Sequence, residues 1–146
     1  MPETGADQAP PWHHLPANPF NPHAWIVGEP TVGPGTWIGA FTVIDGSGGL
    51  SIGAGCDISA GAQIYSHSTV AGAVSARARP IERAATEIGD NCHVGAGAIV
   101  LMGCRIGSQS VVAAGAVVPA FTQAPAHSLL VGVPARVIVD GARKFL

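Results

Sequence analysis

Charged residues are scarce in this chain, at 11% of 146 residues, against about 25% in a typical globular domain. Aromatic residues are also few, at 5%. Disordered chains combine high charge with few aliphatic residues, and this composition is the reverse. A net charge of −2 offers no broad basic field for nucleic acid, so no nucleic-acid partner is expected.

Long hydrophobic runs are missing as well. The apolar stretches are broken by Gly, Arg, Ser and Gln well short of the roughly 18 residues that a membrane-spanning helix needs, so no membrane insertion is expected. The N-terminus lacks a basic segment followed by an apolar one, which argues against a secretory signal. We therefore expect a cytoplasmic protein of one domain.

Aliphatic residues recur at every sixth position, and we call these the anchor positions. Helices repeat at 3.6 residues and strands at 2, so this spacing instead predicts a solenoid. One unbroken series is Ile88, Val94, Val100, Ile106, Val112 and Val118. The same spacing holds earlier, with two residues inserted at GSGG, for Ile26, Val32, Ile38, Ile44, Ile52, Ile58, Ile64 and Val70.

The residue two before each anchor should also point inward, because side chains alternate along a strand. At most anchors it is small, which suits a narrow tube with three strands per coil. Fourteen anchors then give between four and five coils. The three cysteines, Cys56, Cys92 and Cys104, all occupy this position. We interpret them as buried small residues rather than a metal or redox set.

The remaining segments flank or interrupt the ladder. Residues 1–23 hold six of the twelve prolines and predict an extended lead-in, in which Trp12 and Phe20 could contact the body. Residues 24–139 form the predicted β-helix domain. Within it, residues 71–85 leave the pattern as a charged loop, a feature that is commonly functional. Residues 120–139 are expected to cap the last coil, and residues 140–146 form a tail.

Several motifs together resemble the hexapeptide-repeat acyltransferases, and the sugar and xenobiotic O- or N-acetyltransferases in particular. They are YSHS with His67, the loop 71–85, IGDNCHVG, GAGAIVLMGCRIG and Gly132-Val133-Pro134-Ala135-Arg136. The resemblance implies an all-β, left-handed parallel β-helix that assembles as a homotrimer with active sites between subunits. It also implies acetyl-CoA as the acyl donor, with a sugar, a nucleotide sugar or a similar small molecule as acceptor. His93 stands where the family commonly has Trp.

Carried over to this chain, the resemblance makes His67 the general base, since imidazole titrates near neutrality. The expected donor-binding residues are Gly95, Gly97, Ala113, Ala114 and Arg136. The expected acceptor-binding residues are Thr42, Asp57, Tyr65, Arg77, Arg79, Glu82 and His93. Asp45, next to Gly46, is expected to form a turn, with acceptor binding as the alternative.

Two other functions compete with this one. A non-catalytic hexapeptide scaffold would keep the repeats without the chemistry. A metal enzyme like the γ-type carbonic anhydrases would need three His ligands, two of them separated by four residues, and no two His here have that spacing. No metal site is therefore predicted. The chain also shows no helical N-terminal domain of the kind found in serine acetyltransferases, so serine is not the acceptor we expect.

Overall fold

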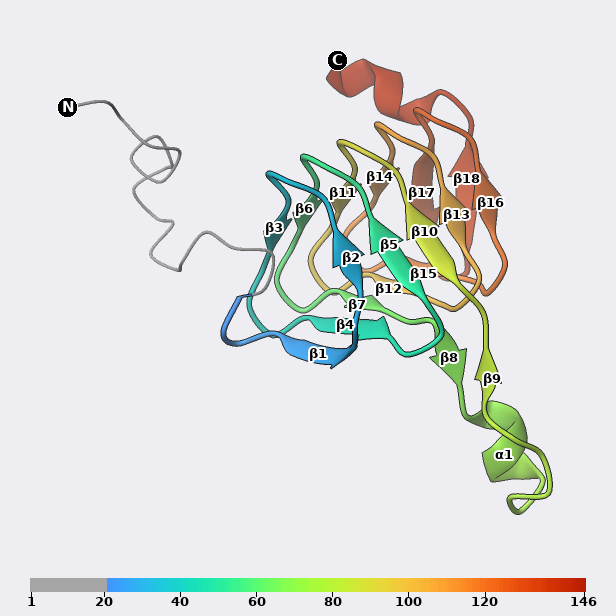
Figure 1. Cartoon of the computed structure of the whole chain (residues 1–146). Coiled ribbons are helices and arrows are strands. Elements are labelled where there is room, and N and C mark those ends of the chain that lie inside the picture. Colours follow the sequence, from blue (N-terminus) through green and yellow to red (C-terminus); the bar gives the residue numbers. More distant parts are fainter. Residues whose placement is uncertain (1–20) are drawn as a thin grey trace.

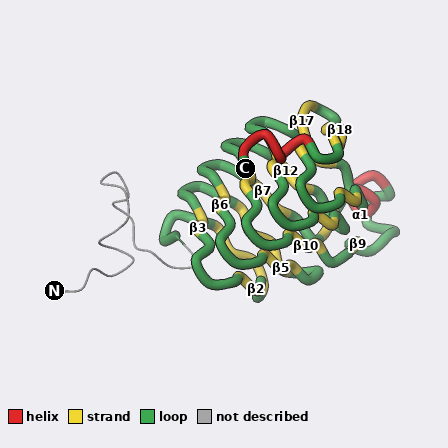
Figure 2. Tube along the Cα trace, turned by 90° about the horizontal axis from the view of Figure 1, so that it is seen from above, coloured by secondary structure: helices red, strands yellow, loops and turns green. Residues whose placement is uncertain are grey.

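The structure, a computed structural model, describes residues 21–146 (Figure 1). Most of the predicted lead-in, with Trp12 and Phe20, lies outside the described residues. From Trp25 the chain winds as the predicted left-handed parallel β-helix, and each coil contributes one short strand to each of three sheets. Figure 2 shows the coils stacked along one axis. No helix among residues 21–146 is long and apolar enough to cross a membrane.

The three sheets form the three sides of the tube. The first sheet contains β1 (Trp25–Gly28), β4 (Val43–Gly46), β7 (Gln63–Ile64), β12 (Ile99–Val100) and β15 (Val117–Val118). The second contains β2 (Thr31–Val32), β5 (Leu50–Ile52), β10 (Thr86–Ile88), β13 (Arg105–Ile106) and β16 (Gln123–Ala124). The third contains β3 (Trp37–Ile38), β6 (Asp57–Ile58), β11 (His93–Val94), β14 (Val111–Val112), β17 (Leu129–Gly132) and β18 (Ala135–Ile138).

The chain turns a corner between sheets, and stacked corners make three edges of the tube. We call them edge I (first to second sheet), edge II (second to third) and edge III (third to first). Several corner residues have positive φ, which glycine adopts without steric penalty. At edge II the stack continues from Gly55 through Asn91 and Gln109 to His127, with φ of 67°, 54°, 55° and 65°. Non-glycine residues thus adopt the left-handed conformation that this edge requires.

The anchor ladder is confirmed by the register of the sheets. Ile44 pairs with Ile64, and Val100 pairs with Val118 on the same sheet. Stacked anchors fill the tube. From Ile38 onward they are buried, except for Val70, which is described below. Ile26 and Val32, at the N-terminal end of the tube, are half-buried. Each buried Ile or Val contributes about 1.5–3 kcal/mol, so this ladder is the main source of stability.

The small inward positions are also confirmed. All three cysteines are buried and free, and burial raises the pKa of the Cys104 thiol. Inward hydroxyl groups donate hydrogen bonds to nearby backbone carbonyls. Thr42 Oγ1 donates to Gly39 O over 3.0 Å, and Thr86 Oγ1 donates to Tyr65 O over 2.7 Å. The interior therefore accepts hydroxyls without leaving them unpaired.

The ladder continues beyond Val118, where the sequence pattern predicted that it would end. Ala124 and Leu130 are buried in the same six-residue phase, on β16 and β17. Pro119 and Pro125 obscured this continuation in the sequence. Both directly follow an anchor, so they lie at corners, where proline is compatible with the turn. The cap is therefore only β18, antiparallel to β17, and a 3-10 helix, η1 (Gly141–Phe145).

The interruption begins earlier than predicted. Residues 67–83 form an arm that projects from edge I (Figure 1), made of β8 (His67–Ser68), α1 (Val70–Val74) and β9 (Glu82–Arg83). Strand β8 pairs antiparallel with β9. Val70 was predicted to be an anchor, but it lies on α1 and is 68% exposed. Its six-residue spacing from Ile64 is coincidental, because the coil has already left the tube.

A charge inside the tube should abolish folding. Ile52 is buried on β5, whereas its neighbour Ser51 is exposed on the outer face of the same strand. We expect Ile52→Asp to lower the free energy of unfolding by several kcal/mol, because the carboxylate finds no partner there. Ser51→Asp, the matched control, should change it by less than about 0.5 kcal/mol. Urea unfolding monitored by circular dichroism compares them, and similar losses for both would contradict the ladder as the core.

Candidate active site

His67 lies on β8 at the base of the arm, where the chain leaves edge I. Its side chain is 28% exposed, and its Nδ1 atom hydrogen-bonds to Oδ2 of Asp45. The Tyr65 ring lies edge-on to the imidazole, with 6.0 Å between ring centroids. Nε2 has no hydrogen-bond partner among residues 21–146. The imidazole is thus held from one side and available from the other.

Asp45 is the residue that orients His67. It lies on β4 with 0% of its side chain exposed. Its Oδ1 accepts a hydrogen bond from the Ser47 N–H and its Oδ2 one from the Ser66 N–H, each over 2.9 Å. Burial alone raises the pKa of a carboxyl, but hydrogen bonds from Ser66, Ser47 and His67 outweigh it and lower the pKa of Asp45 to about 2. The buried group is therefore a carboxylate.

The expected turn at Asp45 is present, since the carboxylate accepts from Ser47 two residues ahead. Its contact with His67 was not predicted from the sequence. One signal could have pointed to it: Asp45 is the only charged residue that directly follows an anchor. Ser66 reinforces the pair, because its hydroxyl donates to Asp45 O over 2.7 Å and accepts from Gly48 N–H over 2.8 Å.

The expected acceptor residues divide between several places. Tyr65 lies beside His67, and its hydroxyl hydrogen-bonds to Gln63 over 2.6 Å. Thr42 is enclosed in the tube and bonded to Gly39, so it does not face an acceptor. Asp57 lies on the third sheet, next to His93 in register and away from His67.

The charged residues of the arm remain exposed. Glu82 on β9 pairs with Ser68, one residue from His67. Arg77 and Arg79 lie in the turn between α1 and β9, so they extend the positive charge of the arm beyond the base of β8. The structure therefore brings Tyr65 close to His67, whereas Glu82 lies opposite Ser68 and the two arginines lie farther out on the same arm. The register partner of His67 itself is Arg83, which was not predicted as a site residue.

The expected donor residues gather on edge III and the adjoining third sheet. A groove of about 640 Å³ runs there, lined by Ser59, His93, Gly95, Ala96, Val111, Ala113, Ala114 and Phe145. Gly97 and Arg136 do not line it, and Phe145 was not predicted to. Small residues leave the backbone accessible along this groove, which we call the donor groove.

Backbone N–H groups without a hydrogen-bond acceptor are present in this groove, at positions next to those that were predicted. The N–H groups of Gly95 and Ala113 already donate to Val112 O and Leu130 O in the coil ladder. Those of Ala96 and Ala114 bond to no other described residue. These two N–H groups are therefore free to bind an extended ligand that carries amide carbonyls.

His67 and the donor groove lie on different edges of the tube. His67 belongs to edge I and the groove to edge III, with the whole first sheet between them. The strands of this sheet, β1, β4, β7, β12 and β15, can be followed in Figure 1. A single chain therefore does not bring the imidazole and the groove together.

No cluster of three or more His, Cys, Asp or Glu side chains that could hold a metal ion occurs within residues 21–146. The site as it stands is an oriented imidazole beside a buried carboxylate. Such a pair can move a proton at Nε2 without a metal.

Two sequence models of hexapeptide families match the chain. "Bacterial transferase hexapeptide (six repeats)" matches residues 85–120, and "Hexapeptide repeat of succinyl-transferase" matches residues 31–66. Both matched segments lie in the coils on either side of the arm.

Curated relatives share part of their length with this chain. The carnitine operon protein CaiE of Salmonella agona is 31% identical over 122 residues, which cover 81% of this chain and 62% of the relative. A serine acetyltransferase of Staphylococcus aureus is 34% identical over 111 residues, covering 75% of this chain and 49% of the relative. The chain thus spans about half to three fifths of these relatives.

Among solved structures, AntD from Bacillus cereus is similar. It is described as an N-acyltransferase in complex with dTDP and 3-hydroxybutyryl-CoA. The TM-score is 0.69 at 20% identity, with 82% of this chain and 66% of that chain covered. At this identity the likeness concerns the fold.

Removing the charge of Asp45 should reduce stability in a pH-dependent way. Because its pKa lies below the ordinary value of about 4, the carboxylate stabilises the folded state above pH 4, and this contribution is lost as pH falls toward 2. Asp45→Asn should therefore lower the free energy of unfolding by about 2 kcal/mol at pH 7, and by less at pH 3. Asp57→Asn, an exposed carboxyl, serves as control.

Urea unfolding of the three proteins at several pH values measures this difference. If wild type and Asp45→Asn differed by the same free energy of unfolding from pH 7 to pH 3, the carboxylate would not be stabilised in the way described.

Proposed function

By its repeats and its fold the chain belongs to the hexapeptide-repeat transferases, and from this premise we propose that it is an acetyl-CoA-dependent acetyltransferase. The acceptor is a hydroxyl or amine of a sugar, a nucleotide sugar or a similar small molecule. The single observation that carries the proposal is the hydrogen bond that holds His67 against the buried carboxylate of Asp45.

The pair is suited to general-base catalysis. With Nδ1–H directed at Asp45, Nε2 carries the free lone pair and accepts the proton of the acceptor as its oxygen or nitrogen attacks the acetyl carbonyl. The carboxylate fixes this tautomer and stabilises the imidazolium that forms. The bond between the acetyl carbon and the sulfur then breaks, and His67 gives the proton to the departing thiolate of CoA, so the base is regenerated.

The donor groove fits the pantetheine arm of the donor. Its wall of Gly and Ala admits an extended chain close to the backbone, and the N–H groups of Ala96 and Ala114 face no competing acceptor among the described residues. Two such donors, one coil apart, match a ligand with more than one amide carbonyl.

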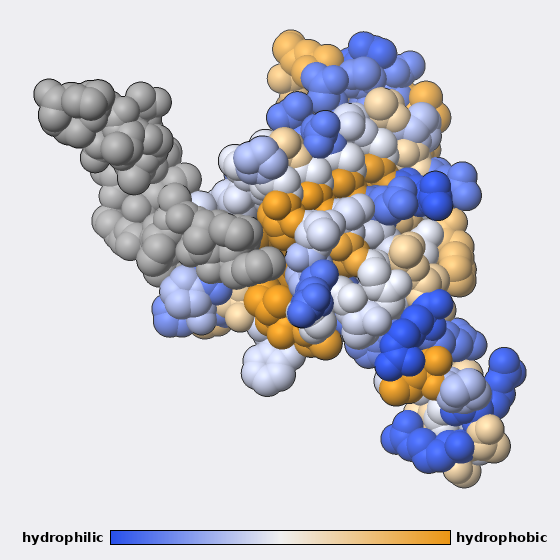
Figure 3. All heavy atoms as spheres, viewed as in Figure 1, coloured by the Kyte–Doolittle hydropathy of each residue, from blue (hydrophilic) through white to orange (hydrophobic). Residues whose placement is uncertain are grey.

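Assembly of the active site requires a second subunit. Because His67 and the donor groove lie on different edges, a cyclic trimer that seats edge I of one subunit against edge III of the next would bring them together. Large apolar side chains of the tube are exposed, among them Trp25 and Phe41, and such exposure is typical of an interface. Figure 3 shows hydrophobic residues at the surface of the tube.

The acceptor would lie between His67 and the arm. Tyr65 lies beside the imidazole, Arg83 on β9 is the register partner of His67, and Arg77 and Arg79 supply positive charge farther out. That charge suits a diphosphate, and the bound dTDP of AntD supports a nucleotide sugar as acceptor. Serine is a second candidate because of the Staphylococcus aureus relative. A panel of dTDP-amino sugars, simple sugars and serine, with release of CoA as readout, distinguishes them.

His67→Ala should lower turnover with the best acceptor by about 10²–10⁴-fold, because the general base is lost. The effect should fall on kcat more than on KM, and the affinity for CoA should hold, since the donor groove is untouched. His23→Ala is the control: this histidine is exposed near Phe41, at the start of the coils, and should leave turnover unchanged. Turnover by His67→Ala within a few-fold of wild type would refute the mechanism.

A further inference from the structure

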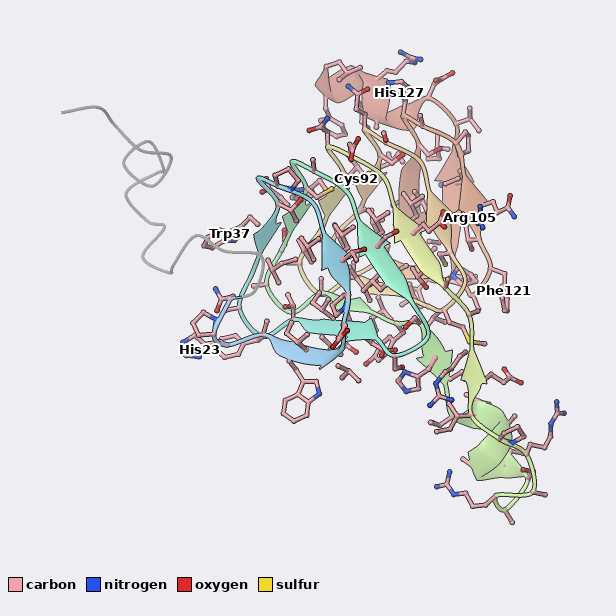
Figure 4. All side chains as sticks on the ribbon, in the orientation of Figure 1. His23, Trp37, Cys92, Arg105, Phe121 and His127 are labelled. Atoms are coloured by element: carbon pink, nitrogen blue, oxygen red, sulfur yellow. The ribbon has the colours of Figure 1, made fainter. Side chains whose placement is uncertain are left out.

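The C-terminal helix η1 is fixed to the end of the third sheet. The Ala142 side chain is buried, and its N–H donates to His127 O over 3.0 Å. Gly141 packs so closely that a Cβ there would lie 2.8 Å from Leu129 and 3.0 Å from Ile138. Figure 4 shows His127 beside this helix. The packing of η1 therefore fixes the position of Phe145, the last residue of this helix.

Phe145 stands between two hollows on the third sheet. One is the donor groove. The other, of about 250 Å³, is lined by Asn91, His93, Gln109, Ser110, Val111, Ala142, Phe145 and Leu146. Phe145, His93 and Val111 line both, so the two hollows are neighbours that share a wall. Phe145 is 64% exposed and hence accessible to a ligand.

The two hollows differ in chemistry. The donor groove presents mainly Gly, Ala and Val, whereas the smaller hollow presents the amides of Asn91 and Gln109. Both amides come from edge II residues with positive φ. The Oε1 atom of Gln109 accepts a hydrogen bond from His127 Nε2 over 3.1 Å, which leaves its NH₂ group as donor.

Positive charge lies next to this hollow. Lys144 Nζ is 5.3 Å from the centroid of the Phe145 ring. Arg143 Nε is paired with Asp140 Oδ1 over 2.8 Å, so Lys144 is the cation of η1 without an ion-pair partner among the described residues. A ligand on the ring would have its phosphates within reach of this ammonium group.

We propose that the smaller hollow and Phe145 bind the adenine ring of the acyl-CoA donor, an assignment that rests on the proposed function. The pantetheine arm lies in the donor groove, and the nucleotide that follows it continues past the shared wall into the smaller hollow. Phe145 supplies a stacking surface, Gln109 and Asn91 supply partners for the ring nitrogens and amine, and Lys144 faces the phosphates. Phe145 is thus a determinant of donor affinity that does not touch the reacting atoms.

Calorimetric titration with three probes, CoA, 4′-phosphopantetheine and a dTDP-amino sugar, tests this assignment. CoA carries the adenosine part, and 4′-phosphopantetheine lacks it. Phe145→Ala should weaken CoA about tenfold and 4′-phosphopantetheine much less, because the stacked base is lost only from CoA while the groove loses one of its eight lining residues. Phe145→Trp should retain CoA affinity. Val139→Ala, an exposed apolar residue near the same helix that lines neither hollow, should change neither affinity.

Other outcomes contradict the assignment. Equal affinity of wild type and Phe145→Ala for CoA would remove Phe145 from the donor site. Equal weakening of CoA and 4′-phosphopantetheine would place its effect on the groove rather than on the base, and weakening confined to the dTDP-amino sugar would assign the ring to the acceptor. If wild type binds neither CoA nor 4′-phosphopantetheine, the proposed function itself fails, and this result is distinct from the other three.

Discussion

The narrow interior of the tube is the constraint on which the rest of the structure depends. Each strand must place one large aliphatic residue and one small residue inside, in register with the coils above and below, as Ile44 does with Ile64. No room remains in this interior for functional side chains. Chemistry is therefore confined to the corners and outer faces, where the backbone is held by the ladder and the side chains are free to vary. His67, the donor groove and Phe145 all lie outside the tube.

The Asp45–His67 pair forms where the six-residue repeat is interrupted. The inserted residues of GSGG and the exit of the arm both lie on edge I, and between them the Ser47 and Ser66 N–H groups turn toward Asp45. A buried carboxylate without such donors would be protonated or would destabilise the fold. The same contacts that make the carboxylate tolerable also fix the imidazole. Stability and proposed catalysis thus depend on one hydrogen-bond network.

The fold could be predicted from the sequence because the period of six is visible residue by residue. The prediction failed at two places. Val70 keeps the six-residue spacing but lies on the arm, outside the tube. Ala124 and Leu130 also keep the spacing, but the prolines that precede them suggested that the repeat had already ended. His67 could be named from its motif. Its partner Asp45 could not, because the contact joins successive coils across an insertion. Phe145 lines the donor groove because of the way η1 packs against the third sheet. That segment lies outside the six-residue repeat, so no sequence pattern indicated its position.

The central claim is that the base of one subunit serves the donor groove of another. Mixing two inactive variants tests it: His67→Ala lacks the base, and Ala114→Trp fills the groove. Co-expressed in equal amounts, they should form mixed trimers in which about a quarter of the sites combine an intact His67 with an intact groove, so acetyltransferase activity should recover to about a quarter of wild type. Mixed trimers as inactive as either variant alone would contradict a site shared between subunits.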